Sequence, residues 1–335
     1  MKVLFNHNHP FRFVDGGTQA QIEQTRLALL SLGVEVEWLR WWDRNQGGDI
    51  VHQFGRPTAS FLMEAQRSGF RVVITDLLGA TGARPRWQLA AMRLVACLIR
   101  RARAERRFDR LDWGGVMIRA DAVILTTEWE AKLTREIFGV APEKVHVVSS
   151  AVEDVYLNSQ PRQRGPWLVS TGTIHAIKRM VELAEAAIVA QTPLWVIGRP
   201  HGNGDAYSDR FMKLASAHPE EIRYEGFVAQ ERLLQAYREA RGFVLLSQYE
   251  TMSLAALEAA ACQCPLLLSD MPWARTTVGD HASYCPPGAS TSTTARILRS
   301  FYDSAPSLPL PPRPISWAEV ARQLKGIYES LLTGN

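Results

Sequence analysis

Two carboxylates lie close together in the segment from Phe243 to Asp270, where they could bind a hydroxylated ligand. Glu250 follows a short apolar run that predicts a buried strand, and Glu258 comes eight positions later, within helix-forming residues. Ser253 between them is a good N-cap, so the first amides of the predicted helix could bind an anion. Carboxylates accept hydrogen bonds from sugar hydroxyls. The segment therefore indicates a site for an anionic, polyhydroxylated ligand.

Two more turns follow predicted strands, one in each half of the chain. The first holds the pair Gly16 and Gly17, whose missing side chains let backbone amides approach a ligand, although a simple tight turn explains them equally well. The second runs over residues 170–179 and carries Lys178 just before a helix. A lysine there can neutralise a diphosphate, and a solvated surface lysine is the alternative. The carboxyl ends of parallel strands are where such turns meet ligands.

Strands alternate with helices along the chain, which predicts an α/β protein with two parallel, doubly wound sheets. In the first half we expect strands at 2–5, 34–38, 49–52, 71–75, 120–125 and 144–149, and helices at 18–32, 60–68 and 126–138. After a polar linker at 159–166 we expect strands at 167–171, 194–197, 222–224, 243–246 and 266–268, and helices at 179–190, 231–240 and 254–262. A proline-rich stretch at 304–314 precedes a last amphipathic helix at 317–332.

Length and composition predict two globular domains. A chain of 335 residues is too long for one ordinary core, and the hydrophobic and charged fractions of 46% and 21% are those of globular proteins. The predicted domains are 1–158 and 166–312, with the helix in 313–335 packing back on the first domain. A net charge of +4 gives no sign of a nucleic-acid partner.

The four cysteines and the N-terminus predict a cytoplasmic protein. Cys97, Cys262, Cys264 and Cys285 form no disulfide or metal pattern, which favours a reducing compartment. The first residues form a predicted strand rather than a signal peptide, and no apolar run reaches the roughly 18 residues of a membrane span.

The segment from Arg84 to Arg110 is strongly basic, with nine arginines. Four of them recur every seven residues and would share one helix face, next to a face that carries three apolar residues. One interpretation is a helix lying on anionic lipid at the inner face of the membrane. The other is a solvated surface helix.

Several common catalytic motifs are missing from the sequence. No Gly-x-Gly-x-x-Gly follows the first strand, and no P-loop or Gly-x-Ser-x-Gly elbow occurs. No cluster of histidines and cysteines has metal-ligand spacing, and no Asp-x-Asp is present to hold a cation on a diphosphate. These absences argue against a dinucleotide oxidoreductase, a P-loop enzyme and a serine hydrolase, and we expect neither cofactor nor metal.

The segment around the two glutamates resembles the signature of the family 4 glycosyltransferases of the GT-B fold, in which two glutamates are separated by seven residues. Other segments resemble that family in the same order, so the resemblance covers nearly the whole chain. They are Gly16–Gly17, Ala120–Glu128, Lys144–Val152, Gly172–Lys178 and Tyr224–Val228.

The resemblance implies two Rossmann-like domains facing a central cleft, with the acceptor on the N-terminal domain and the donor on the C-terminal one. It implies a retaining, metal-independent hexosyltransferase of glycan or cell-surface polysaccharide synthesis. The donor would be a UDP- or GDP-sugar, and the acceptor a saccharide or a lipid-linked group. The departing phosphate is thought to assist attack on the same face of the sugar, so no protein nucleophile is required.

The resemblance also implies a role for individual residues. Lys178 would stabilise the charge that grows on the leaving diphosphate, and Glu250 would lie by the donor sugar, so these two are the predicted catalytic residues. Glu258 would bind the ribose hydroxyls, while Phe227 and Val228 would hold the base. The remaining predicted donor-binding residues are Gly16, Gly17, Gly172, Thr173, Met252, Ser253 and Leu254.

This chain departs from the family pattern at three places. Thr173 stands where the family usually has an arginine, so Arg179 or Arg199 would have to supply the second cation on the diphosphate. The usual Gly-Phe-Gly between the glutamates is Thr251–Ser253, which alters the sugar pocket. The family's histidine near the fourth strand is missing, and the candidates for the acceptor side are His7, His9 and His52.

Two other functions stay open at this stage. A nucleotide-sugar epimerase has the same fold and would turn over the donor alone. A catalytically degenerate protein would bind the nucleotide sugar without transferring it. The sequence leaves the base, the sugar, the acceptor and the oligomeric state undetermined.

Overall fold

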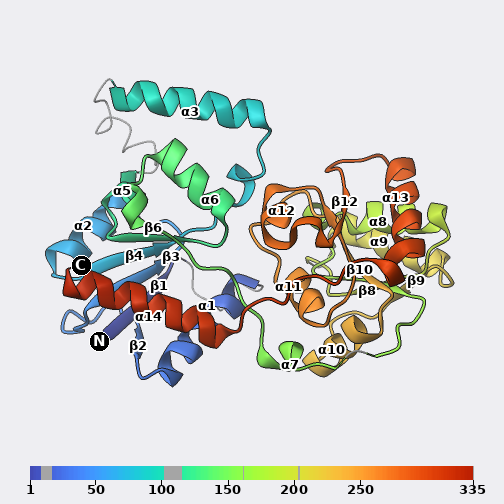
Figure 1. The fold of residues 1–335 in the computed structure, drawn as a ribbon, viewed down its shortest axis with the longest axis horizontal. Coiled ribbons are helices and arrows are strands. Elements are labelled where there is room, and N and C mark those ends of the chain that lie inside the picture. The colour runs from blue at the N-terminus through green and yellow to red at the C-terminus, as the bar shows by residue number, and fades with distance from the viewer. Residues whose placement is uncertain (9–16, 102–114, 161, 203, 335) are drawn as a thin grey trace. The chain divides into compact units, whose positions relative to one another are not determined.

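A computed structural model describes residues 1–8, 17–101, 115–160, 162–202 and 204–334 of the chain (Figure 1). The chain divides into two compact units. The first comprises Met1–Ala151 and Ile315–Asn335, and the second comprises Val152–Pro314. The second unit thus begins before the predicted linker at 159–166. The reason is local, because Tyr156 is buried against Tyr237, and Arg164 donates hydrogen bonds to the carbonyls of Ala240 and Gln263 at 2.8 and 2.7 Å.

The first unit is a six-stranded parallel sheet in the order β2-β1-β3-β4-β5-β6. Its strands are β1 (Lys2–His7), β2 (Glu35–Trp38), β3 (Ile50–Phe54), β4 (Arg71–Thr75), β5 (Ala122–Leu125) and β6 (Val145–Val147). Its helices are α1 (Gly17–Ser31), α2 (Ala59–Arg67), α3 (Arg86–Arg101), α5 (Gly115–Arg119), α6 (Glu128–Leu133) and α14 (Trp317–Thr333), with short turns η2 (Gly79–Thr81), η4 (Thr134–Phe138) and η5 (Pro142–Lys144).

The second unit repeats this design with the strand order β12-β11-β10-β7-β8-β9. Its strands are β7 (Leu168–Thr171), β8 (Leu194–Ile197), β9 (Ile222–Tyr224), β10 (Gly242–Leu245), β11 (Leu266–Ser269) and β12 (Ser283–Cys285). Its helices are α7 (Asp154–Leu157), α8 (Met180–Ala190), α9 (Ala206–Ala217), α10 (Gln230–Glu239), α11 (Leu254–Ala261), α12 (Pro272–Val278) and α13 (Thr291–Ser304), with η6 (Ala176–Lys178), η7 (Gly279–His281) and η8 (Ala305–Ser307).

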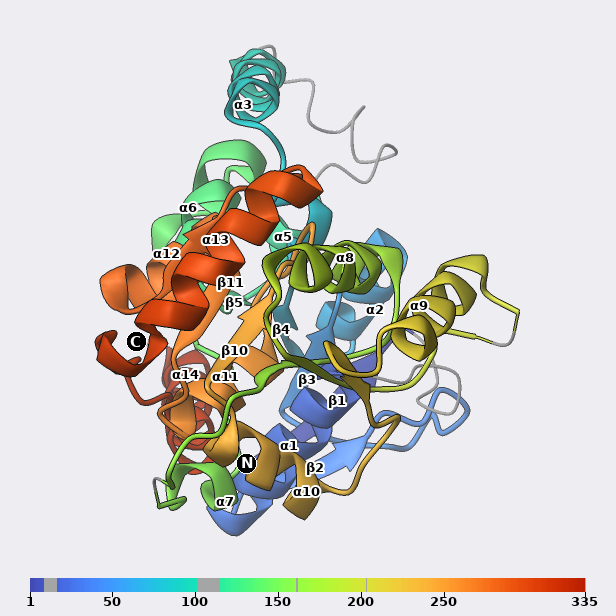
Figure 2. The ribbon, with the colours of Figure 1, turned by 90° about the vertical axis from the view of Figure 1, so that its right-hand side faces the viewer.

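Apolar strands buried on both faces form the core of each unit, as expected for parallel sheets. In the second unit, α8 and α13 run side by side over the sheet (Figure 2), and Phe301 and Leu298 of α13 are fully buried there. The predicted α/β fold class is confirmed, with each unit a doubly wound parallel sheet.

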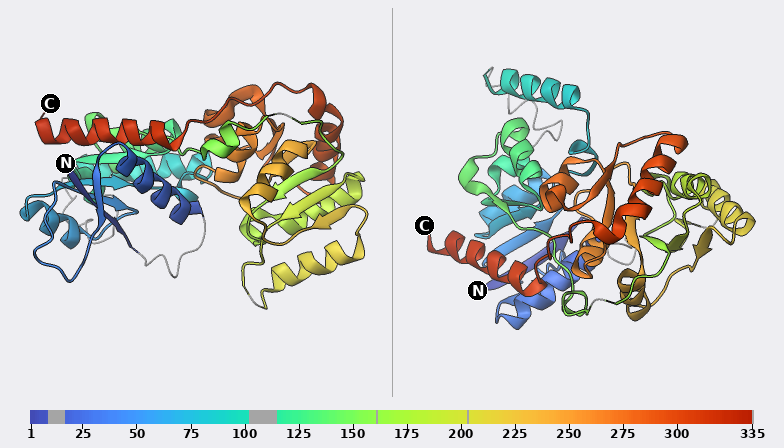
Figure 3. Two further views of the ribbon diagram at one scale, coloured as in Figure 1. Left: turned by 90° about the horizontal axis from the view of Figure 1, so that it is seen from below. Right: turned by 45° about the vertical axis from the view of Figure 1, so that its right-hand side comes forward.

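The last helix, α14, belongs to the first unit and packs along α1 (Figures 1 and 3). Ser316 caps it by accepting a hydrogen bond from the Glu319 amide, and Trp317, Leu324 and Tyr328 are buried. The predicted helix 126–138 is α6 followed by a wider π-helical turn, η4, which Gly139 ends with a left-handed φ of 74°. Sequence reasoning missed α5, α7, α9, α12, α13 and β12.

Candidate functional site

The carboxyl edge of the second sheet has a topological switch point between β7 and β10. From β7 the chain continues to β8 on one side, while β10 lies on the other side and continues to β11. Turns that leave two adjacent strands in opposite directions open a crevice between them, and ligands of doubly wound sheets bind there. The predicted catalytic residues lie in these turns, since Lys178 follows β7 and Glu250 follows β10.

Lys178 and Glu250 form an ion pair across the switch point, between Nζ and Oε1. Both side chains are largely buried, with exposed fractions of 28% and 14%. The Ser247 hydroxyl also donates to Glu250 Oε1, at 2.8 Å, and the Gln248 amide donates to the Ile177 carbonyl at 2.7 Å. The two turns are therefore joined through backbone and side chains, and they bring the two predicted catalytic residues into contact.

Glu258 lies one helix turn further on, at the side of α11, and is half-buried. The Tyr237 hydroxyl donates to its Oε2 at 2.9 Å, and the same hydroxyl is 2.8 Å from Thr171 Oγ1, at the end of β7. Burial raises the pKa of Glu258 to about 7, although the hydrogen bond from Tyr237 opposes that rise. A carboxyl group that is about half ionised at neutral pH therefore lies beside the switch point.

The N-terminus of α11 has the cap that the sequence predicts. Ser253 is in an extended conformation, and its hydroxyl accepts a hydrogen bond from the Ala256 amide at 3.3 Å. Met252 and Leu254 on either side are half-buried. Because the first amides of a helix have no partner within it, this end of α11 can accept an anion next to Glu250.

Two glycine turns pack closely beside the pair of Lys178 and Glu250. Gly172 and Gly198 follow β7 and β8 with positive φ angles of 140° and 152°. A Cβ on Gly198 would lie 1.9 Å from the Gly172 carbonyl oxygen, so only glycine fits there. The Ile174 amide donates to the Arg199 carbonyl at 2.9 Å, which holds the Thr173 turn against the Arg199 turn.

The two arginines considered as replacements for the cation missing at Thr173 differ in their surroundings. Arg179 is buried, adopts a left-handed φ of 55°, and donates to the Ala289 carbonyl at 2.9 Å. Its guanidinium group therefore holds the start of α8 against the turn before α13. Arg199 is exposed, and its guanidinium carbon is 4.5 Å from the ring centroid of Phe227, which is 72% exposed. Val228 next to Phe227 is half-buried.

In the first unit the surroundings of His52 do not fit the acceptor role predicted for it. This side chain is fully buried, with Nδ1 2.5 Å from the Tyr328 hydroxyl and Nε2 2.7 Å from Thr75 Oγ1. Burial lowers its pKa to about 3. Hydrogen bonds of His52 therefore link α14 to the sheet. His7 is half-buried at the end of β1, and Gly17 begins α1, whereas Gly16 and His9 lie outside the described residues.

Sequence reasoning missed an aromatic and amide cluster at the carboxyl edge of the first sheet. The Trp41 ring is 70% exposed and lies 5.7 Å from the Phe61 ring, and its Nε1 donates to Asn6 Oδ1 at 3.2 Å. Asn6 Nδ2 donates to Gln53 Oε1 at 2.6 Å, and Gln53 Nε2 donates to Asn8 Oδ1 at 2.9 Å. The signal for this cluster was the Trp41–Trp42 pair in a polar loop after a strand.

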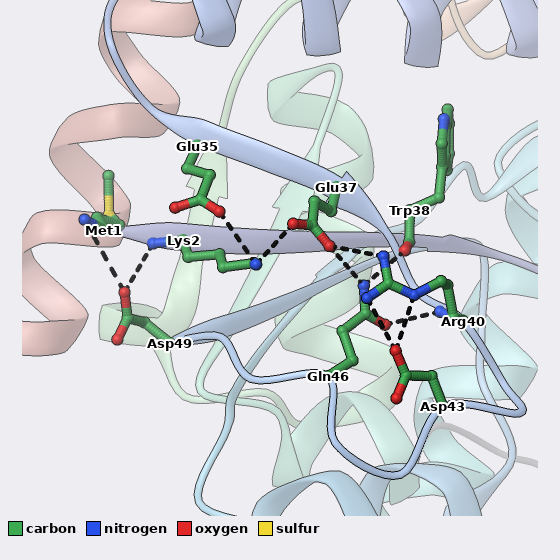
Figure 4. Close-up of polar contacts among 9 residues, drawn as sticks. All are labelled: Met1, Lys2, Glu35, Glu37, Trp38, Arg40, Asp43, Gln46 and Asp49. Atoms are coloured by element: carbon green, nitrogen blue, oxygen red, sulfur yellow. Dashed lines mark hydrogen bonds and ion pairs between the residues drawn. The ribbon is translucent and has the colours of Figure 1, made fainter.

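A polar network holds the loop that carries Trp41 against β2 (Figure 4). Lys2 Nζ is 2.6 Å from Glu37 Oε1, and Arg40 bridges Glu37 and Asp43 at 2.9 and 3.0 Å. Gln46 Nε2 donates to Glu37 Oε2 at 2.9 Å. The hydrogen bond from Lys2 lowers the pKa of Glu37 to about 2. The loop is thus fixed at both ends, and the Trp41 ring is held in place.

Comparison with known proteins finds a family model that matches most of the second unit. Residues 165–303 match the model described as glycosyl transferases group 1, so the predicted resemblance is confirmed. The chain is 24% identical over 253 residues, 65% of its length, to D-inositol 3-phosphate glycosyltransferase 1 of Catenulispora acidiphila. It is 35% identical over 100 residues, 30% of its length, to O-antigen chain mannosyltransferase B of Escherichia coli. It spans 59% of the first relative and 23% of the second.

Solved structures match over the whole chain. Sucrose-phosphate synthase of Thermosynechococcus elongatus aligns with a TM-score of 0.67 at 18% identity, covering 100% of this chain and 99% of that one. HepE of Anabaena, solved in complex with UDP and glucose, aligns with a TM-score of 0.66 at 12% identity, covering 98% and 100%. These likenesses show the fold, which is the pair of Rossmann-like domains of the GT-B class.

Proposed function

We propose that this protein transfers a hexosyl group from a nucleotide diphosphate sugar to an acceptor hydroxyl. The observation that carries the proposal is the meeting of Lys178 and Glu250 at the switch point of the sheet in the group 1 glycosyltransferase segment. Glu258 and the capped N-terminus of α11 lie in the same set of turns. The carboxyl group of Glu258 can accept hydrogen bonds from hydroxyl groups, and the first amides of α11 can bind an anion. HepE, which has this fold, is solved with UDP and glucose, and that supports a nucleotide-sugar donor.

In the proposed reaction the bond between the anomeric carbon and the diphosphate oxygen breaks, and its electron pair leaves with the diphosphate. The acceptor oxygen bonds to the anomeric carbon and gives its proton to the departing phosphate, so that the sugar keeps its configuration. Lys178 and the amides at Ser253 and Leu254 stabilise the growing negative charge, which is where fixed charges accelerate a reaction most. We assign no metal to this step, because these groups perform the charge neutralisation.

The ion pair of Lys178 and Glu250 belongs to the ligand-free protein in this scheme. An incoming diphosphate carries more charge than one carboxylate and competes for Lys178. Glu250 then becomes free to accept hydrogen bonds from the sugar hydroxyls. Arg199, exposed beside the Thr173 turn, is the second cation for the diphosphate, and Arg179 is not, since its guanidinium group is buried in a structural contact.

We assign the remaining donor contacts to the turns around the pair. Glu258 accepts hydrogen bonds from the ribose hydroxyls, and the exposed Phe227 ring, with Val228, contacts the base of a UDP- or GDP-sugar. The backbone of Gly172 and Thr173 lies next to Lys178, with Lys178 Cε 3.9 Å from the position of a Cβ on Gly172. Exposed aromatic rings and convergent polar groups are typical of small-molecule sites.

On the first unit we place the acceptor, a saccharide or a lipid-linked group, at the carboxyl edge of the sheet. Trp41 offers an exposed ring for a sugar face, and the amides of Asn6, Asn8 and Gln53 offer hydrogen bonds beside it. His7, at the end of β1, belongs to the same edge. We also propose a cytoplasmic location and a role in glycan or cell-surface polysaccharide synthesis.

A donor screen tests the proposal. Purified protein is heated with UDP, GDP and their hexose conjugates, because a bound ligand raises the unfolding temperature in proportion to its affinity. The stabilising conjugate is then incubated with a panel of saccharide and lipid-linked acceptors, and transfer is followed by mass spectrometry. We expect stabilisation and an acceptor-dependent product. Conversion of the donor sugar without acceptor would identify an epimerase, and tight binding with no turnover would identify a degenerate protein.

A further inference from the structure

Helix α3 of the first unit exposes a continuous apolar face. Leu89 and Ala96 are 1% and 5% exposed and pack toward the core and η4. On the opposite side Trp87, Leu94 and Leu98 are 71%, 63% and 57% exposed. These residues lie one or two helical turns apart and share one stripe, which the exposed Ala91 and Val95 widen. Figure 1 shows α3 at the margin of the first unit, with the unit on one side of it.

The arginines of α3 whose side chains the structure describes, Arg86 and Arg93, differ in their surroundings. Arg93 points toward η4, where its Nη2 is 2.5 Å from Glu136 Oε2. Arg86 is exposed at the start of the helix, and Arg84 is exposed just before it. The residues that face outward on this side of α3 are Trp, Leu, Val and Ala. The arginines at 103, 106, 107 and 110 lie outside the described residues.

The charged residues of α3 itself have one sign. The sequence of α3, from Arg86 to Arg101, contains four arginines and no aspartate or glutamate. A helix that combines an exposed apolar stripe with arginines and no carboxylate complements the surface of an anionic bilayer, whose headgroups attract cations while the acyl boundary accepts the apolar side chains. Tryptophan is enriched at this boundary, and arginine stems reach past apolar neighbours to the headgroups.

The size of the face favours a bilayer over a second copy of the chain. A 16-residue helix is about 24 Å long, and a stripe about 10 Å wide along it covers about 240 Å². A stable interface buries about 800 Å² on each partner. The stripe alone is too small for such an interface, whereas a bilayer accepts a single helix face and binds it reversibly. Among the described residues no helix is long and apolar enough to cross a membrane.

We propose that α3 lies in the surface of an anionic membrane, with Trp87, Leu94 and Leu98 inserted at the acyl boundary and the exposed Arg84 and Arg86 at the headgroups. This inference does not rest on the proposed transfer reaction. It gives α3 a role in membrane binding, which is separate from the reaction proposed at the switch point of the second unit.

Vesicle flotation tests the proposal with the full chain. The probes are vesicles of phosphatidylcholine alone and vesicles in which one third of the lipid is phosphatidylglycerol. We expect the wild-type protein to float with the anionic vesicles at low salt and to bind much less in about 1 M salt, because the Debye length there falls to about 3 Å. The variant with Trp87→Ser, Leu94→Ser and Leu98→Ser should bind at least tenfold more weakly.

A matched variant controls for general loss of surface hydrophobicity. Val189 on α8 and Leu27 on α1 are 63% and 51% exposed, and Val189→Ser with Leu27→Ser should leave flotation unchanged. Circular dichroism checks that both variants are folded, and if the triple variant is not, Leu94→Ser alone replaces it.

Three results would overturn the proposal. They are wild-type protein that stays off anionic vesicles at low salt, equal loss of binding in the control variant, and a wild-type dimer in sedimentation that the α3 variant separates into monomers. The last would show that a second copy covers this face. A fourth result, equal binding to the two kinds of vesicle, would also overturn the proposal, because it requires an anionic membrane.

Discussion

The two sheets have the same six-stranded parallel design, yet their carboxyl edges are equipped differently. In the second unit the turns carry charged groups, Lys178, Glu250 and Glu258, and glycines that let two turns approach closely. In the first unit the edge carries Trp41 and a chain of amides. The first set suits an anionic ligand and the second a neutral one, so one architecture supports two kinds of recognition through its turns.

Two buried titratable groups sharpen this contrast. Glu258 is partly buried and accepts a hydrogen bond from Tyr237, and burial raises its pKa to about 7. His52 is fully buried with both ring nitrogens bonded, and burial lowers its pKa to about 3. A carboxylate can accept several hydrogen bonds, so Glu258 keeps accepting capacity, whereas both nitrogens of His52 are engaged in the fold. Burial alone therefore does not mark a functional group; the hydrogen-bonding capacity that it has left does.

The largest effect should come from the charged edge. We expect Lys178→Ala to lower kcat/KM by about a hundredfold or more, because it removes a cation where negative charge develops in the transition state. The measurement is the initial rate of transfer with the donor that the thermal-shift screen identifies.

Lys213→Ala is the matched control for Lys178→Ala, since Lys213 is an exposed lysine on α9 of the same unit. It should leave the rate unchanged. Near-normal transfer by the Lys178 variant would remove Lys178 from the reaction and leave the ion pair with Glu250 a structural one.

The buried histidine should affect stability instead. His52→Ala removes both hydrogen bonds and leaves the Tyr328 and Thr75 hydroxyls without that partner, which should lower the free energy of unfolding by about 2 kcal/mol. Urea denaturation measures the loss, and faster hydrogen exchange in β3 and α14 would place it in the first unit. Donor affinity should not change.

The same histidine predicts acid sensitivity. Its pKa in the folded protein lies below the usual value, so the stability it contributes is present above about pH 6.5 and is lost as the pH falls toward 3. His52→Ala should therefore flatten the fall in stability over this range. If the His52→Ala variant is instead as stable as the wild type and has a raised KM for the acceptor, then His52 belongs to the acceptor site.

Much of the fold and of the charged edge could be predicted because turn motifs and strand runs are local signals. Buried strands such as 71–75 and 194–197, and the cap at Ser253, need only neighbouring residues to be recognised. Helix α13 was missed because its first turn is rich in serine and threonine and its stability comes from packing of Phe301 against the sheet and α8.

The rest of the site depends on contacts between distant residues. The His52 side chain is hydrogen-bonded to Tyr328, 276 positions away in the sequence, and no local pattern predicts that contact. Arg179 and Arg199 are equally plausible cations in the sequence, and only the contact with Ala289 shows that Arg179 is engaged. The sequence also left open which face of α3 packs inward, because a seven-residue repeat fixes which residues share a face but not which face meets the core.

For Glu258 we expect a pH-dependent change in affinity for the nucleotide sugar of about tenfold per pH unit. Its carboxyl group must be ionised to accept both ribose hydroxyls, and its pKa in the free protein is about 7. We expect affinity for the nucleotide sugar to be constant above about pH 8 and to weaken about tenfold per pH unit below 7, since each protonated molecule must first lose its proton. Calorimetric titration from pH 5.5 to 8.5 measures this.

Glu258→Gln is the control for the pH profile. Its affinity should be lower at pH 8 and independent of pH, because the amide does not titrate. A wild-type affinity that is flat across the range, or a variant that keeps the pH dependence, would rule out the ribose contact by the ionised carboxyl group.

The smallest effect should come from the uncharged edge. Trp41→Ala removes the exposed ring beside Asn6, and we expect the KM for the acceptor to rise about fivefold, since a stacked aromatic contact is worth about 1 kcal/mol. Donor affinity should stay the same, because that site lies on the other sheet. Trp42→Ala is the matched control, since Trp42 is 80% exposed in the same loop. Equal effects of the two variants, or a change in donor affinity, would contradict the division of labour between the two edges.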